Sequence, residues 1–328
     1  MVSPVGRLNT VARIRPTARV ASAAPATPAA RVAPAAPVAT TLPLFPDAGP
    51  RYLPFREELG FVPYSILDPW GSAEARVRDV ELRALIGDHG QSRRGVLGGS
   101  ARSLMTNEAS VFSPVFTEAL LSIYGPRPPA AVLDPFAGGG TRAAVCALMG
   151  HRYVGIELRR GEVDRVRRAL VALGPTVGEA KLLVGDSSDI NGVAVQEAAA
   201  WGCFDFLLTC PPYWKLERYG GGPDDLSEVS YREYMGGLER VLAWTFESLS
   251  PGALAVWVVG NLLDGDEYVD IRADLSVAAR GVGWVLHDLP VMRQKIGTAG
   301  QRVANSAKSK RLVRIHEYAV VLRRPVSK

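Results

Sequence analysis

The stretch Val-Leu-Asp-Pro-Phe-Ala-Gly-Gly-Gly-Thr at residues 132–141 indicates how this chain folds. Its apolar beginning is typical of a buried strand, and a helical pattern follows Thr141. Three consecutive glycines permit positive φ angles and let the backbone approach a ligand closely. No Gly-Lys-Ser/Thr follows, and the GxGxxG spacing is absent, so neither a P-loop nor a dinucleotide turn is indicated. We therefore expect a ligand loop between a strand and a helix, with a plain turn as the alternative.

Outward from this loop, short apolar runs alternate with amphipathic stretches. Such alternation predicts an α/β fold with a mostly parallel sheet and helices on both faces. No helix is expected between the last two strands, so they can pair antiparallel at one edge. The expected strands are 131–134, 153–157, 181–186, 204–210, 254–260, 284–291 and 318–322, and the expected helices are 141–149, 160–173, 193–201, 231–249 and 268–280.

Acidic residues stand at the ends of three successive expected strands, namely Asp134, Glu157 and Asp186. Ligands of open α/β sheets bind at this edge, and an acid about 20 residues after the first strand is placed to bind ribose hydroxyls. Each acid alone is better explained as a helix N-cap. Together they favour a nucleoside ligand, and because only Arg142 supplies a positive charge near the loop, a ligand without phosphates.

The fourth of these strands runs into Cys-Pro-Pro-Tyr-Trp at residues 210–214. Two prolines end the hydrogen-bonded ladder and fix the following backbone. The segment then presents two aromatic rings, which can stack on a base. A rigid strand exit with aromatic rings packed in the core is the alternative.

The composition is that of a globular protein, with 328 residues, 47% apolar and 22% charged, and three cysteines in no CxxC spacing. It excludes a disulfide-stapled miniprotein and a zinc ribbon. No apolar run approaches the roughly 20 residues of a membrane span. The cysteine usage fits a reducing compartment, and we expect the cytoplasm.

The chain divides into three expected regions. Residues 1–50 are rich in Ala, Pro and Arg without periodicity, which predicts a disordered tail, with an organelle transit peptide as the less favoured alternative. Residues 51–105 form an N-terminal segment that is a candidate for substrate contact. The regular pattern begins near residue 106, so one catalytic domain is expected over 106–328.

The net charge of +5 is unevenly spread, because the segment 293–314 contains seven basic residues and no acid. This concentration predicts a local contact with a polyanion, with a solvated surface loop as the alternative. The basic residues of the segment are Arg293, Lys295, Arg302, Lys308, Lys310, Arg311 and Arg314.

The motifs DPFAGGGT and TCPPYW, with the acidic strand end and GDSSD between them, resemble those of S-adenosylmethionine-dependent DNA methyltransferases of the exocyclic-amine type. The chain is similar in particular to the DNA modification methylases of bacteriophages and prophages. That likeness extends more loosely over 62–68, 110–114, 213–227 and 314–318. It implies a Rossmann-like class I methyltransferase fold with a seven-stranded, mostly parallel sheet, an antiparallel edge strand and helices on both faces.

The resemblance also implies roles for individual residues. Glu157 would hold the ribose of S-adenosylmethionine, and Asp186 the adenine amine. The residues around the methionine part would be Ser110, Phe112, Asp134, Phe136, Gly138 and Gly140. The Cys210, Pro211, Pro212 and Tyr213 corner would face the target base, Trp214 would stack on it, and the basic residues from Arg293 to Arg311 would contact DNA phosphates.

The implied reaction is direct transfer of a methyl group to cytosine N4 or adenine N6 in double-stranded DNA. A base must leave the duplex to reach such a pocket, and alignment matters more than acid–base help. No metal is expected. Cys210 departs from the usual Ser, Asp or Asn, and thiol sulfur is a weak acceptor. An RNA base methyltransferase, a weakly catalytic cofactor- or DNA-binding homologue, and a Cys210 nucleophile for pyrimidine C5 are the alternatives.

Overall fold

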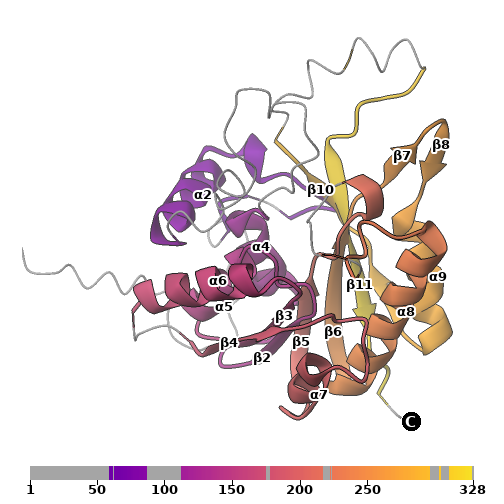
Figure 1. Ribbon diagram of the computed structural model, residues 1–328. Helices are drawn as coiled ribbons and strands as arrows, with labels where there is room; N and C mark the ends of the chain where they lie inside the picture. The colour runs from indigo at the N-terminus through magenta and orange to yellow at the C-terminus, as the bar shows by residue number, and fades with distance from the viewer. Residues whose placement is uncertain are drawn as a thin grey trace, which may run out of the picture. The chain divides into compact units, whose positions relative to one another are not determined.

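Figure 1 shows the computed structural model of the chain, which describes residues 59–61, 63–86, 112–174, 178–216, 222, 224–295, 303 and 310–326. The expected tail at residues 1–50 lies outside the described residues, as does more than half of the segment 51–105. The division of the chain into three regions therefore stays a prediction.

Five parallel strands form the first half of the main sheet, in the order β4-β3-β2-β5-β6. This is the strand order of a Rossmann-like sheet. The central strands are apolar and almost wholly buried, as expected where helices cover both faces. Each strand was predicted from the sequence; their bounds are β2 (Ala131–Asp134), β3 (Arg152–Glu157), β4 (Ala180–Val184), β5 (Phe204–Thr209) and β6 (Leu249–Val259).

The sheet continues through β11 (His316–Arg323), which pairs antiparallel with β6 on one side and with β9 (Val285–Asp288) and β10 (Val291–Arg293) on the other. The predicted Rossmann-like fold with its antiparallel strand is thereby confirmed. One strand was expected over 284–291, but Pro290 lacks an amide hydrogen and the strand is divided there into β9 and β10. With β1 (Ile66–Leu67) parallel to β10, the described sheet has nine strands rather than seven.

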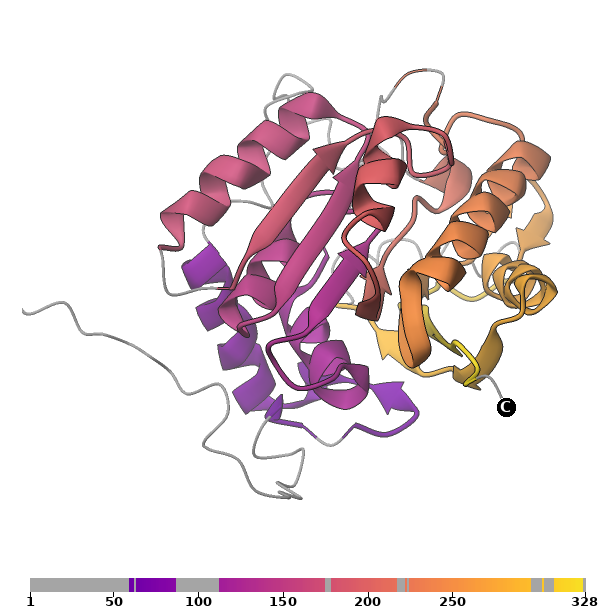
Figure 2. The same cartoon turned by 90° about the horizontal axis from the view of Figure 1, so that it is seen from below.

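Helices cover both faces of the sheet (Figures 1 and 2). On one face α4 packs against α5, and Val166 of α6 lies against the loop before α5. On the other face α7, α8 and α9 contribute buried side chains to one apolar cluster. The bounds are α4 (Pro114–Tyr124), α5 (Thr141–Leu148), α6 (Arg160–Ala172), α7 (Val193–Ala199), α8 (Tyr231–Ser248) and α9 (Ile271–Val282).

Several elements were not predicted, and α4 is one of them. The helix α2 (Ala73–Ile86), preceded by the 3-10 turn η1 (Pro69–Gly71), packs against α4 and α5, so the described part of the N-terminal segment belongs to the same sheet-and-helix body. A two-stranded hairpin of β7 (Leu262–Asp264) and β8 (Glu267–Val269) precedes α9, where the sequence pattern indicated a helix from residue 268. Asp270 caps α9 by accepting a hydrogen bond from the amide of Ala273 (3.1 Å).

Candidate active site

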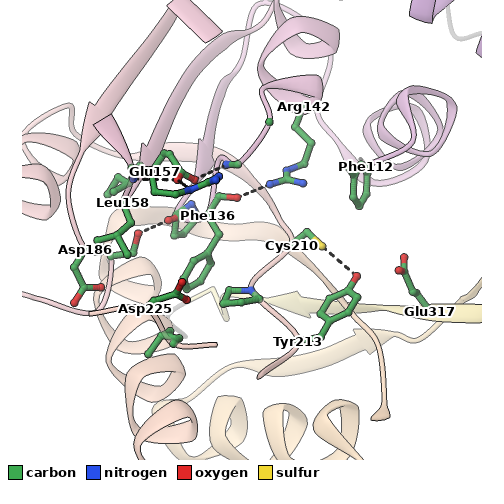
Figure 3. Close-up of a pocket in the computed structure, with 18 of the residues that line it drawn as sticks. Phe112, Phe136, Arg142, Glu157, Leu158, Asp186, Cys210, Tyr213, Asp225 and Glu317 are labelled. Carbon is green, nitrogen blue, oxygen red and sulfur yellow. Dashed lines mark hydrogen bonds and ion pairs between the residues drawn. The ribbon is translucent and has the colours of Figure 1, made fainter. Parts of the chain in front are cut away.

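One cavity, here called the central cavity, extends along the carboxyl-terminal ends of β2, β3, β4 and β5 (Figure 3). Parallel strands bring these ends to one edge, which is why motifs far apart in the sequence meet here. Of the predicted site residues, those lining the central cavity are Phe112, Phe136, Gly138, Glu157, Asp186, Cys210, Pro212 and Tyr213. The others on these loops lie elsewhere, and Ser110 is outside the described residues.

Asp134, the last residue of β2, is fully buried and does not line the central cavity. Its Oδ1 accepts hydrogen bonds from the hydroxyl of Thr209 (2.6 Å) and the amide of Phe136 (3.1 Å). Its Oδ2 accepts from Arg142 Nε (2.7 Å) and the hydroxyl of Tyr153 (2.8 Å). A carboxylate offers about four lone-pair sites, so little acceptor capacity is left. The structure thus places Asp134 beneath the loop, where it holds the backbone, and not in the predicted contact with the methionine part.

Arg142, the second residue of α5, is the counter-ion of Asp134 and is only 5% exposed. Burial disfavours its charged form, but the adjacent Asp134 carboxylate outweighs this and raises the pKa of Arg142 above its ordinary value. The guanidinium of Arg142 therefore keeps its positive charge despite its burial. Its guanidinium lies 4.9 Å from the ring centroid of Phe112 and lines the central cavity.

The glycine loop, defined as residues 135–140, has two positions that require glycine. Gly138 has φ +55° and lines the cavity, and its amide donates to Glu157 Oε2 (3.1 Å). Gly140 has φ +82°, and a Cβ there would lie 2.5 Å from the Val166 side chain. Gly140 does not line the central cavity, so its role is the close packing of α5 against α6 rather than the predicted cofactor contact.

Glu157 and Asp186 both face the central cavity from neighbouring strands, as expected. Glu157 Oε1 accepts hydrogen bonds from the amide and the Nε of Arg159 (3.0 and 2.9 Å), which orients the carboxylate. Asp186 accepts from the amide and hydroxyl of Ser188 (2.8 and 2.9 Å). Both acids are thus held in place at the edge of the sheet, with Gly138 between Glu157 and the start of α5.

The Cys-Pro-Pro-Tyr corner closes the other end of the central cavity. Cys210 Sγ lies 3.1 Å from the hydroxyl of Tyr213, in a hydrogen bond that either atom can donate. The ring of Tyr213 is seated against Gly260, where a Cβ would lie 3.0 Å from the ring. Pro212 also lines the cavity, and its carbonyl accepts from the hydroxyl of Tyr234 (2.9 Å).

Two residues of the corner depart from the prediction. Pro211 is buried and does not line the central cavity. Trp214 belongs to the apolar core, where its indole nitrogen donates to the carbonyl of Val229 (2.8 Å) and its ring lies 4.9 Å from that of Tyr231. Trp214 does not line the central cavity either, so the core-packing alternative describes this ring.

Sequence reasoning missed several polar residues that line the central cavity. Glu317 of β11 accepts a hydrogen bond from Gln294 Nε2 (2.7 Å), and both side chains line the cavity. Asp225 reaches it from the segment before α8 and accepts from the amide of Ser227 (2.9 Å). Asp225 and Glu317 lie in the two loosely similar segments 213–227 and 314–318, which was the available signal. Arg142 was noted only as a nearby charge.

Four of the predicted phosphate contacts lie in the described residues, and three of them are paired with acids of the chain. Arg293 forms an ion pair with Asp68, and Arg311 pairs with Asp266, with Arg311 Nη1 3.7 Å from its Oδ1. Lys295 Nζ lies 3.0 Å from Asp79 Oδ2 and 4.3 Å from the ring centroid of Trp70. Each of these three side chains therefore already has an acidic partner within the chain. Lys310 is exposed, while Arg302 and Lys308 lie outside the described residues.

A second cavity, here called the basic cavity, adjoins the central one and shares Tyr213, Gln294 and Glu317 with it. Its positively charged or ionisable lining comes from Lys295, Arg311, Arg314 and His316. In the part of the chain that the structure describes, Arg314 has no acidic partner; its guanidinium lies 5.7 Å from the ring centroid of Tyr268. Arg314 therefore carries the uncompensated charge of this cavity.

The described residues contain neither a membrane-spanning helix nor a metal-binding cluster. None of the described helices is both long and apolar enough to pass through a membrane. Among the same residues, no cluster of three or more His, Cys, Asp or Glu side chains is arranged to bind a metal ion.

No protein-family model matches the sequence, and no curated protein matches it. Among solved structures, the fold is similar to TrmN from Thermus thermophilus, with 19% identity and a TM-score of 0.43 over 67% of this chain and 50% of that one. It is similar to a TehB-like SAM-dependent methyltransferase from Corynebacterium glutamicum (17%, TM-score 0.39, 78% of this chain and 100% of that one). The fold is also similar to that of a putative RNA methyltransferase from Pyrococcus horikoshii, with 15% identity and a TM-score of 0.41 over 65% of this chain and 83% of that one.

This chain thus spans half the length of TrmN. Identities and TM-scores this low concern the fold, so the activities and substrates named for those proteins do not extend to this chain.

Proposed function

We propose that this protein is an S-adenosylmethionine-dependent methyltransferase that methylates the exocyclic amine of a nucleic-acid base, with DNA as the polymer. The observation that carries the proposal is the shared central cavity. The glycine loop, Glu157 and Asp186 line one end of it, and Cys210 and Tyr213 line the other. A nucleoside cofactor and a target base can therefore occupy one continuous space.

The cofactor end fits a nucleoside without phosphates. Glu157 and Asp186 present carboxylate oxygens from adjacent strands, and such oxygens accept from ribose hydroxyls and an adenine amine. In the described lining the two arginines, Arg142 and Arg159, are each bound to an acid of the chain.

The catalytic end requires alignment more than proton transfer. When bound, S-adenosylmethionine supplies an electrophilic methyl group on its sulfonium. Tyr213 offers a ring face on which an extruded base stacks, which fixes the amine relative to the cofactor. The bond between the Tyr213 hydroxyl and Cys210 Sγ, together with the backing of Gly260, holds that ring.

The corner itself supplies only a poor acceptor for the amine, because sulfur accepts weakly and Pro211 does not line the cavity. Glu317 reaches the cavity from β11, on the side where Tyr213 lies in Figure 3. A carboxylate is a strong acceptor, and Gln294 Nε2 orients it through the hydrogen bond to Glu317 Oε2. We therefore assign to Glu317 the role of accepting a hydrogen bond from the target amine.

The basic cavity supports a nucleic acid as the substrate. It opens beside Tyr213, where the backbone next to an extruded nucleotide would run, and Arg314 gives it an unpaired positive charge. Phosphate contacts of this kind position a nucleic acid without reading its sequence. DNA is chosen over RNA because the DPFAGGGT and TCPPYW motifs resemble those of DNA methylases.

The test is methyl transfer from labelled S-adenosylmethionine to genomic DNA from a strain without methylation, with tRNA and ribosomal RNA as parallel substrates. Digestion to nucleosides and mass spectrometry identify the product. We expect N4-methylcytosine or N6-methyladenine from duplex DNA. Methylated product from RNA alone would mean that RNA, not DNA, is the substrate. Cofactor binding without methyl transfer would indicate a weakly catalytic homologue. If neither cofactor binding nor methyl transfer is detected, the proposal is rejected.

A pair of substitutions separates the two candidate acceptors. Cys210→Ser replaces a weak acceptor by a better one, so methyl transfer is expected to stay at the wild-type rate or rise. Glu317→Gln removes a charged hydrogen bond, which is worth about 1.5–3 kcal/mol, and the turnover rate is expected to fall roughly 10- to 100-fold. Both rates are measured at saturating cofactor.

Cofactor affinity, measured by calorimetry with S-adenosylhomocysteine, should be the same in both variants. A Cys210→Ser variant with no activity would point to a thiol nucleophile. Full activity of Glu317→Gln would remove Glu317 from the mechanism.

A further inference from the structure

Arg142 holds a position that the functional roles described above do not use. It follows the glycine loop at the start of α5, is 5% exposed, and lines the central cavity. Figure 3 shows its guanidinium between the glycine loop and Phe112, on the same side of the cavity as Cys210. A buried charge that borders a ligand cavity is more than a structural counter-ion if some of its donors face that cavity.

The hydrogen bonds of Arg142 leave such donors. Its Nε donates to Asp134 Oδ2 (2.7 Å), and its Nη2 donates to the carbonyl of Phe136. A guanidinium has five N–H donors in a planar fork, and in the described part of the chain Nη1 donates to no protein group. Arg142 lines the central cavity, so donors not used by Asp134 and Phe136 are within reach of a ligand there.

The order of the strands indicates which part of the cofactor would lie beside Arg142. Along the sheet, Asp186 follows β4, Glu157 ends β3, the glycine loop follows β2, and Cys210 follows β5. If Asp186 and Glu157 hold the adenosine of S-adenosylmethionine and its sulfonium methyl group lies at Cys210, the cofactor spans this edge. The amino-acid part then lies over the end of β2, beside Arg142 and Phe112.

We propose that Arg142 binds the carboxylate of the amino-acid part of S-adenosylmethionine. The inference rests on the proposed function and assigns a recognition residue to the same site. The other lining acids, among them Glu157, Asp186 and Glu317, would repel a carboxylate, whereas Arg142 is the positive charge at this end of the cavity. Asp134 and Phe136 fix the plane of the guanidinium, so its remaining N–H groups are oriented before the ligand arrives.

The test compares two ligands that differ only in this group. Calorimetry measures the dissociation constants of S-adenosylhomocysteine and of its decarboxylated analogue, 5′-deoxy-5′-(3-aminopropylthio)adenosine. For the wild-type protein we expect the analogue to bind roughly 10- to 100-fold more weakly, because it lacks a charged hydrogen-bond acceptor. Equal affinity for the two ligands would overturn the inference while leaving the cofactor assignment intact.

Variants of Arg142 test whether this residue causes the difference in affinity between the two ligands. Arg142→Gln combined with Asp134→Asn removes both charges of the buried pair, so no unpaired charge remains, and folding is checked by circular dichroism. The ratio of the two dissociation constants is expected to fall to about one. Arg142→Lys keeps a positive charge without the planar fork and should lower the ratio partly.

Arg159→Gln is the matched control, because it removes the lining arginine at the adenosine end, which is bound to Glu157. It is expected to weaken both ligands equally and to leave the ratio unchanged. A wild-type ratio retained in the Arg142 variants would overturn the inference. Failure of the wild-type protein to bind S-adenosylhomocysteine would instead reject the proposed function.

Discussion

Asp134→Asn is expected to lower the free energy of unfolding by about 3–5 kcal/mol, the usual cost of breaking a buried ion pair by removing one partner. The substitution leaves the Arg142 guanidinium buried and uncompensated. It also weakens the hydrogen bonds that tie β2 to Thr209, Tyr153 and the amide of Phe136. Chemical denaturation followed by circular dichroism measures the change.

Asp164→Asn serves as the matched control. Asp164 pairs with Arg167 at 3.9 Å, and both side chains are about half exposed, at 46% and 52%. Exposed pairs contribute about 0–1 kcal/mol, so this variant should unfold close to the wild type. A small effect of Asp134→Asn, similar to the control, would contradict the role of Asp134 as the anchor of the glycine loop.

Tyr213→Ala is expected to reduce methyl transfer at least about 100-fold, since stacking on an aromatic side chain is worth roughly 1–3 kcal/mol per base and misalignment adds to this loss. Affinity for S-adenosylhomocysteine should be retained, because the proposed adenosine site lies at Glu157 and Asp186. Single-turnover rates with labelled cofactor give the first quantity, and calorimetry gives the second.

Two further variants show what the ring itself contributes. Tyr213→Phe keeps the aromatic face and removes the hydroxyl that meets Cys210 Sγ, so most of the activity should remain. Trp214→Phe alters the neighbouring core ring and should lower stability without a selective effect on transfer. Full activity of Tyr213→Ala would end the stacking role.

The sequence alone predicted β2 to β6 and the helices that join them, whereas α4 and the β7–β8 hairpin were missed. Apolar runs and glycine turns are local signals, and they located β2 to β6 within a few residues. They also placed the glycine loop, Glu157, Asp186 and the Cys-Pro-Pro-Tyr corner at one sheet edge, because parallel strands share that edge. The division at Pro290 was missed, although the proline that causes it is visible in the sequence.

Only the tertiary structure decided which polar groups face the cavity. Asp134 and Glu157 end adjacent strands, yet Asp134 is enclosed by Thr209, Tyr153 and Arg142, whereas Glu157 reaches the ligand space. The sequence pattern is the same for both acids. Their difference comes from side chains on neighbouring strands and helices, which no local pattern encodes.

The basic segment 293–314 is a second case in which the sequence pattern does not show how side chains are paired. Arg293 and Lys295 form ion pairs with Asp68 and Asp79, acids that lie 225 and 216 residues earlier in the chain. A count of charges along the segment treats these side chains as available, because pairing over such separations arises only when β1 and β10 join the same sheet. The sequence therefore fixes how much charge a segment carries, and the packing of distant segments fixes how much of it is left for a partner.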